Sequence, residues 1–187
     1  LKLLHKRTES LTLEGFLSSR KCNLSESLLS ELSETCSNLK RLKLKKFYIH
    51  ADKIELQHLP RSLTHLSLGN SEVCNLPPEA NSYFKNIHLT FPHLEVLDLE
   101  NCGWVSNHSL MAISKVESLK EISLKGCFQI GNCFAYTALA TNFGFNNLEK
   151  INLQDTDISD KELCCFGRKP KLRELHVGGQ FGCKLTD

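Results

Sequence analysis

The amino-acid sequence predicts an α/β domain built from stacked repeats, with a curved parallel sheet on one side and helical or extended segments on the other. One observation is the apolar pattern L-x-x-L-x-L, whose spacing fits neither a strand nor a helix throughout. A second is that this pattern recurs at intervals of 24 to 31 residues. Its second apolar position falls at Leu11, Leu42, Leu66, Leu97, Ile122, Ile151 and Leu175. An internal repeat of this length indicates a solenoid of the leucine-rich repeat type.

Each copy of the pattern predicts one short strand. Leu42 and Leu44 should point into the core, whereas Arg41, Lys43 and Lys45 should point outward, because successive side chains of a strand face opposite sides. One unit cannot bury its apolar side alone, so neighbouring units must stack. We therefore expect a single leucine-rich repeat domain over residues 1–187, with about seven repeats and truncated at both ends.

The position after each strand carries small or polar side chains. Counted from the first leucine of the pattern, the ninth residue of successive units is Phe47, Ser71, Cys102, Cys127, Thr156 and Gln180. Hydroxyl, amide and thiol groups there can bond to neighbouring backbone. The nine cysteines are odd in number and several follow the repeat, so we expect reduced thiols in a cytoplasmic or nuclear protein.

The segments between the strands are predicted to differ in structure. Asn23 and Glu26 form an N-x-x-E capping pattern ahead of one helix, Ser106 is the expected N-cap of a second, and Ser159 with Glu162 begins a third. The segment of residues 47–63 is short, and the segment of residues 73–94 contains three prolines. We therefore expect extended or single-turn 3₁₀ structure in both segments.

The composition and motifs favour a non-catalytic protein. The formal charge of +2 is too small to imply a nucleic-acid or membrane partner, and no apolar run approaches the roughly 20 residues of a membrane span. The segment "GGQFGCKLT" differs from a phosphate loop because Cys183 stands where glycine is required. No motif of a hydrolase, a metalloprotease or a four-ligand zinc site is present, so we expect no enzyme activity, cofactor or metal.

Charge is uneven over the outward strand positions. The second strand is wholly basic and the fourth is largely acidic, and the candidate partner-binding residues are Arg41, Lys43, Lys45, His65, Asp98, Glu100 and Lys125. These charges are either a solvated surface that blunts aggregation or a binding surface on the inner sheet. On the second interpretation the basic row contacts an acidic or phosphorylated protein target. Asp98 and Glu100 are expected about 10 Å from the basic row, beyond the screening length of roughly 8 Å.

Several segments resemble F-box/LRR proteins. The resemblance rests on "LEVLDLENCGWVSNHSLMAI", "LKEISLKGCFQI", the lead-in "CSNLKRLKL" and the closing "GCKLTD". It implies the substrate-recognition part of an SCF-type E3 ubiquitin ligase, in which a separate F-box binds Skp1 and, through it, a cullin. This chain contains no F-box, and Ser37 replaces the usual proline before Asn38. The alternative is an F-box-free leucine-rich repeat adaptor or a ribonuclease-inhibitor-like binding protein.

Overall fold

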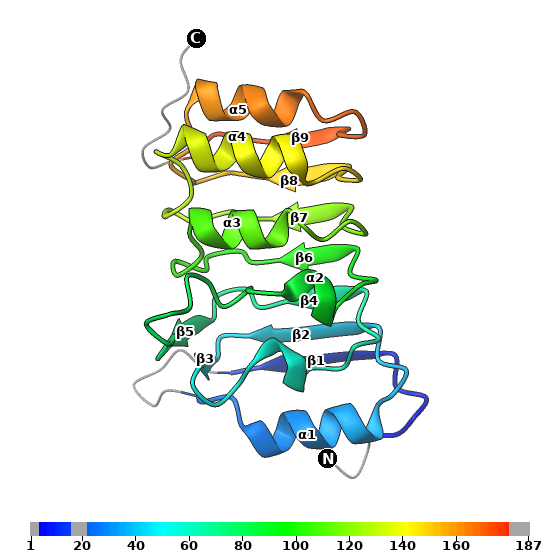
Figure 1. Ribbon diagram of the computed structural model, residues 1–187. Helices are drawn as coiled ribbons and strands as arrows, with labels where there is room; N and C mark the ends of the chain where they lie inside the picture. The colour runs from blue at the N-terminus through cyan, green and yellow to red at the C-terminus, as the bar shows by residue number, and fades with distance from the viewer. Residues whose placement is uncertain (1–3, 16–21, 180–187) are drawn as a thin grey trace.

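The computed structural model describes residues 4–15 and 22–179, and its main feature is a sheet of seven parallel strands (Figure 1). The spatial order of these strands follows the chain, and each repeat of the sequence contributes one strand, as predicted. The strands are β1 (Ser10–Glu14), β2 (Arg41–Lys45), β4 (His65–Ser67), β6 (Val96–Asp98), β7 (Glu121–Ser123), β8 (Lys150–Asn152) and β9 (Glu174–His176).

The register of the sheet aligns equivalent residues of every repeat. The second apolar positions form one continuous row from Leu11 to Leu175, through Leu42, Leu66, Leu97, Ile122 and Ile151. A shift by one residue would turn these apolar side chains toward solvent, so burial of the row specifies the pairing. The predicted alternation of inward and outward side chains is confirmed in β1, β2, β6, β7 and β8. In β4 the outward Ser67 is also buried, and in the last strand, β9, all three residues are exposed.

A second, smaller sheet lies beside the first. It consists of β3 (Tyr48–His50) and β5 (Glu72–Cys74), which run parallel and pair Ile49 with Val73. Each of these strands begins one residue after the ninth position of its repeat. The extended segments expected after the second and third repeats are thus present.

The helices stand on one side of the main sheet (Figure 1). They are α1 (Glu26–Thr35), the 3₁₀ turn η1 (Leu56–His58), α2 (Ile87–Thr90), α3 (Asn107–Ile113), α4 (Phe134–Phe143) and α5 (Asp160–Gly167). The 3₁₀ turn expected in residues 47–63 is confirmed. In residues 73–94 the turn is a four-residue α-helix instead, which begins after both Pro77 and Pro78 have been passed and ends before Pro92.

Two of the three predicted helix starts are confirmed. Ser106 precedes α3, and its backbone N–H donates to the Ser109 hydroxyl at 3.4 Å. Ser159 precedes α5, and its N–H donates to Glu162 Oε2 at 2.9 Å. The prediction that Asn23 begins the capping pattern of α1 was wrong, because the N-cap of α1 is Ser25. Asn23 instead continues the extended chain through an isolated bridge to Tyr48.

Helix α4 was not predicted, and its amphipathic pattern is reversed. Thr137, Ala140 and Thr141 are buried, whereas Phe134 and Phe143 are exposed. The hydroxyl of Thr141 is satisfied by donating to the Thr137 carbonyl at 2.8 Å. Small inward residues bring the backbone of α4 close to its neighbours, but they leave no apolar stripe by which the sequence would reveal the helix.

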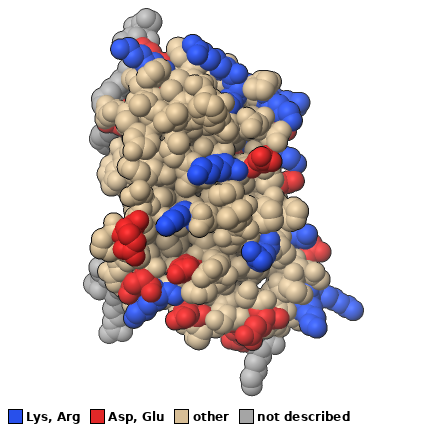
Figure 2. Space-filling view, in the orientation of Figure 1, with Lys and Arg blue, Asp and Glu red and all other residues tan. Residues whose placement is uncertain are grey.

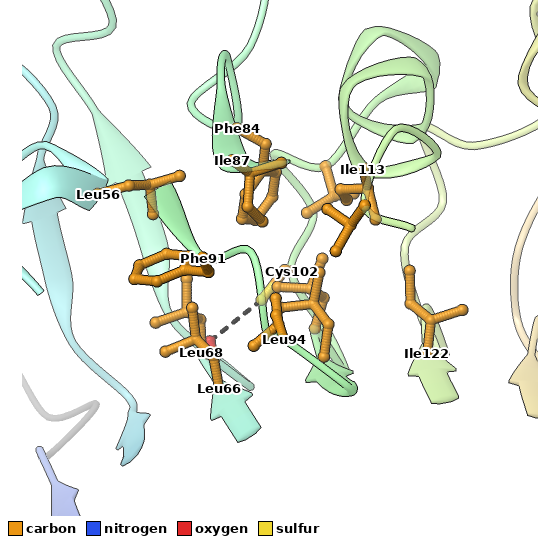
Figure 3. Close-up of a cluster of buried hydrophobic side chains, with 14 of the residues drawn as sticks. Leu56, Leu66, Leu68, Phe84, Ile87, Phe91, Leu94, Cys102, Ile113 and Ile122 are labelled. Atoms are coloured by element: carbon orange, nitrogen blue, oxygen red, sulfur yellow. Dashed lines mark hydrogen bonds between the residues drawn. The ribbon is translucent and has the colours of Figure 1, made fainter. Parts of the chain in front are cut away.

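The core lies between the main sheet and the helices (Figure 3). Leucines 66, 68 and 94 of the strand side meet Phe84, Ile87 and Phe91 of the α2 segment, and all six are at most 1% exposed. The close-up also shows the Cys102 thiol donating to the Leu68 carbonyl, 3.2 Å away. The core is therefore continuous across repeats rather than confined to one of them.

The ninth positions link successive repeats through hydrogen bonds. Ser71 Oγ donates to the Leu44 carbonyl at 3.1 Å, and Cys127 Sγ donates to the Leu99 carbonyl at 3.1 Å, as Cys102 does to Leu68. Thr156 differs by bonding within its own repeat, to Leu153. Gln180 lies outside the described residues. None of the eight cysteines in the described part of the chain is in a disulfide.

Candidate partner-binding face

The face of the main sheet opposite the helices presents the outward strand residues in rows. One row runs from Arg41 to His65, Val96 and Glu121, and the next runs from Lys43 to Ser67, Asp98 and Ser123. A third begins with Lys45 paired to Glu14. Neighbouring parallel strands are about 4.8 Å apart, so side chains in one row can contact each other directly.

The most basic part of this face is strand β2. Arg41 and Lys43 are exposed, and Lys45 is half-buried. Within residues 4–15 and 22–179, no carboxylate lies within 4.0 Å of the charged nitrogens of Arg41 or Lys43. These two cations are therefore available to a negatively charged partner. We call this pair, together with the adjoining His65, the basic site.

The expectation that no carboxylate would reach the basic row was wrong for Lys45. Its Nζ lies 3.9 Å from Asp98 Oδ2, although the two strands are separated by β4. The reason is the small residues between them. Gly69 has no side chain, and a Cβ built on it would lie 3.7 Å from Asp98 Oδ2. A lysine side chain can therefore extend across β4, which the spacing of the strands alone does not reveal.

Asp98 is held in place from within the chain. Its Oδ2 accepts a hydrogen bond from the Ser67 hydroxyl at 2.7 Å, and its Oδ1 accepts one from the Glu100 N–H at 3.1 Å. The carboxylate thus has three partners when Lys45 is included. This makes Asp98 part of the fold's own polar network, and it contributes little negative potential to a partner.

The two remaining charged candidates, Glu100 and Lys125, pair across adjacent repeats, and so do two neighbouring charges outside the candidate set, Lys150 and Glu174. Lys125 Nζ lies 3.3 Å from Glu100 Oε1, so both are compensated. Lys150 Nζ lies 2.8 Å from Glu174 Oε2, and this hydrogen-bonded pair raises the pKa of Lys150 and lowers that of Glu174. Such exposed pairs contribute little stability. Their effect is to leave Arg41 and Lys43 as the uncompensated charges among the seven named candidates.

His65 is fixed beside Arg41 by its own neighbours. The two residues are paired in register on β4 and β2, and the His65 ring is half-buried. Its Nδ1 lies 2.9 Å from the Thr64 hydroxyl, which restrains the imidazole. The structure therefore brings together Arg41, Lys43 and His65, whereas Glu100 and Lys125 belong to a separate ion pair farther along the sheet.

Sequence reasoning missed several ion pairs, and one of them borders the candidate face. Lys120 Nζ lies 2.9 Å from Glu95 Oε1, and this contact raises the pKa of Lys120. Both residues stand one position before a strand, in consecutive repeats. That shared position is a signal in the sequence that could have identified the pair.

The helix side of the molecule differs in that it includes an area without charged side chains. Figure 2 shows a broad area without charged side chains where α4 lies, and α4 itself contains no charged residue. Phe134, Leu139 and Phe143 are exposed there by 52, 47 and 81%. The helix side therefore carries an uncharged, partly apolar area over α4, with charged side chains elsewhere on the same side.

The part of the chain that the structure describes contains neither a metal-binding cluster nor a membrane-spanning helix. No group of three or more His, Cys, Asp or Glu side chains there is arranged to hold a metal ion. No helix there is long and apolar enough to cross a bilayer.

Comparison with known proteins identifies a distant structural neighbour. No family model matches the chain, and no curated protein matches it. Among the similar solved structures is a chain of the crystal structure of the TLR13–ssRNA13 complex, with 17% sequence identity and a TM-score of 0.41. The match covers 96% of this chain but 32% of the other, so the chain spans about a third of that neighbour's length.

Proposed function

We propose that the chain is a leucine-rich repeat solenoid that binds a protein target through the exposed face of its parallel sheet. The observation that carries the proposal is the basic site, where Arg41 and Lys43 project from one strand without an ionic partner in the described residues. A folded protein gains no stability from unpaired like charges held on one strand. Their arrangement suits an acidic or phosphorylated segment, which arginine can bind bidentately and lysine as a point charge.

We further propose that the full-length protein is the substrate receptor of an SCF-type E3 ubiquitin ligase in the cytoplasm or nucleus. This rests on the sequence resemblance to F-box/LRR proteins, carried by segments such as residues 94–113 and 119–130. In this proposal the chain is a non-catalytic recognition module. Skp1 and a cullin would join through an F-box elsewhere in the full-length protein, and neither a nucleic acid nor a membrane takes part.

The ligase proposal is tested by affinity purification of the full-length protein. Skp1 should co-purify with it in stoichiometric amount, and residues 1–187 alone should capture none. If the full-length protein binds no Skp1, the alternative takes its place, which is an F-box-free adaptor or a ribonuclease-inhibitor-like binder. That outcome would leave the target-binding face unaffected, since the face requires only the repeats.

A further inference from the structure

We propose that Cys74 is a reactive thiol that forms mixed disulfides with low-molecular-weight disulfides, with His50 as its base and Asn23 as a positioning residue. The three residues come from three segments that the fold places side by side. Their arrangement follows the order nucleophile, base and orienting group that activates cysteine elsewhere. This site is separate from the basic site, and it does not depend on the proposed function.

The small sheet brings the thiol and the imidazole together. His50 on β3 is paired in register with Cys74 on β5, so both side chains leave the same face. Asn23 adds a third extended segment through its bridge to Tyr48, where the Leu24 N–H donates to the Tyr48 carbonyl at 2.9 Å. Because Tyr48 and His50 lie two residues apart on one strand, Asn23 shares their face.

Hydrogen bonds fix which imidazole nitrogen faces the thiol. His50 Nε2 lies 3.1 Å from Asn23 Oδ1, an oxygen that can only accept, so Nε2 carries the proton. Nδ1 is then an acceptor. It lies 3.4 Å from Cys74 Sγ and 3.2 Å from the amide nitrogen of Asn75, which donates to it. The single lone pair of Nδ1 is thus shared between the Asn75 amide and the Cys74 thiol, and the thiol also lies 3.6 Å from the Ile49 carbonyl oxygen.

Cys74 has a backbone carbonyl near its sulfur, as several other cysteines do, but it also has an imidazole there. Cys102 and Cys127 are fully buried and donate to backbone carbonyls, and Cys164 is exposed. Cys74 is half-buried, so solvent reaches it. Among the eight described cysteines it is the one whose sulfur lies within hydrogen-bonding distance of an imidazole nitrogen.

The reaction is a single thiol–disulfide exchange. The Cys74 S–H proton passes to His50 Nδ1 as the sulfur attacks one sulfur atom of the small disulfide. A new S–S bond forms to Cys74 while the S–S bond of the reagent breaks. The departing thiolate takes the proton from His50, so one disulfide and one thiol enter and one mixed disulfide and one thiol leave.

Site-resolved mass spectrometry of the folded chain with oxidised glutathione tests the proposal. Cys74 should form the mixed disulfide faster than Cys164, although Cys164 is more exposed. His50→Gln should slow the reaction at Cys74 at least tenfold, since a positioned base contributes about 100-fold or more in favourable cases. The rate at Cys164 should stay unchanged, and the buried Cys102 and Cys127 should remain unmodified, which shows that the variant is folded.

Two variants of Asn23 test its role as a positioning residue. Asn23→Ala should slow the reaction at Cys74, whereas Asn23→Asp should retain the rate because its carboxylate still accepts from His50 Nε2. A merely structural role would not distinguish these two variants. The proposal is overturned if Cys164 in the unaltered protein reacts as fast as Cys74, or if folded His50→Gln reacts at the same rate as the parent.

Discussion

At the scale of single residues, the ninth position of four repeats combines burial with a hydrogen bond from the side chain, at Ser71, Cys102, Cys127 and Thr156. Cys102 and Cys127 are fully buried, and each thiol donates to a carbonyl of the preceding repeat. Burial raises the pKa of both thiols to about 12. A protonated thiol is a weak nucleophile, so these two cysteines should resist alkylation until the protein unfolds.

The raised pKa values predict a loss of stability in alkali. Below pH 9 both thiols are protonated in the folded and unfolded states, whereas between pH 9 and about 12 the unfolded state alone releases their protons. The free energy of unfolding should fall by about 1 kcal/mol per thiol for each pH unit in this window. Urea denaturation at pH 8 and pH 10 measures the fall.

A serine variant separates this effect from other alkaline titrations. Cys102→Ser keeps a donor for the Leu68 carbonyl but does not ionise in this range, so its stability should fall less between the two pH values. Cys164→Ser is the matched control, because this thiol is exposed in the folded protein. Equal pH dependence in the parent and in Cys102→Ser would show that the buried thiol does not contribute.

At the scale of elements, Glu162 joins two helices. It is 1% exposed; its Oε2 accepts from the Ser159 N–H, and its Oε1 accepts from the Cys133 N–H at 2.8 Å. The first contact lies at the start of α5, and the second lies at the start of α4. One carboxylate therefore satisfies backbone donors that both helices would otherwise leave unpaired.

Removing this carboxylate should destabilise the protein. Glu162→Ala leaves two half-buried backbone donors without an acceptor, and we expect a loss of about 1 to 3 kcal/mol in the free energy of unfolding. Lys161→Ala changes the adjacent, exposed residue and should be neutral within about 0.5 kcal/mol. Chemical denaturation measures the free energy of unfolding of both variants. If Glu162→Ala also loses less than about 0.5 kcal/mol, Glu162 does not stabilise the two helices in this way.

The helices also show where sequence reasoning works and where it fails. The capping pattern of Ser159 with Glu162 is local, so it predicted α5 correctly. In α4 the fold selects small residues inward and leaves Phe134 and Phe143 outward, a choice set by packing against α3 and α5 rather than by local preference. The sequence contains no periodic signal for such a helix.

At the scale of the whole molecule, the row of second apolar positions holds the repeats together. Leu97 lies in the middle strand of the seven and is fully buried. Leu97→Asp would bury an unpaired charge and should cost at least about 3 kcal/mol. Val96→Asp alters the half-buried neighbour on the opposite face and should cost far less. Thermal and urea unfolding that ranks Val96→Asp as the less stable protein would contradict the assigned facing of the strand.

The candidate face was predictable in its register but not in its electrostatics. The repeat places Arg41, Lys43 and His65 on adjacent strands of one face, as the structure confirms. The contact between Lys45 and Asp98 could not be foreseen, because it depends on the side-chain path over Gly69. Likewise the contact between His50 and Cys74 was overlooked, although their separation of 24 residues equals the interval between Leu42 and Leu66.

Charge reversal at the basic site tests the central claim most directly. The chain, an Arg41→Glu/Lys43→Glu variant and a Lys85→Glu/Lys115→Glu control are titrated with a panel of acidic and phosphoserine peptides and neutral counterparts. Lys85 and Lys115 are exposed on the helix-side segments, so the control changes net charge equally. We predict that the unaltered chain binds acidic or phosphorylated peptides more tightly than their neutral counterparts. At low salt, the Arg41→Glu/Lys43→Glu variant should lose at least about tenfold in affinity for these peptides, whereas the control should change little. Equal losses in both variants, or no preference for acidic peptides, would contradict a binding site on this face.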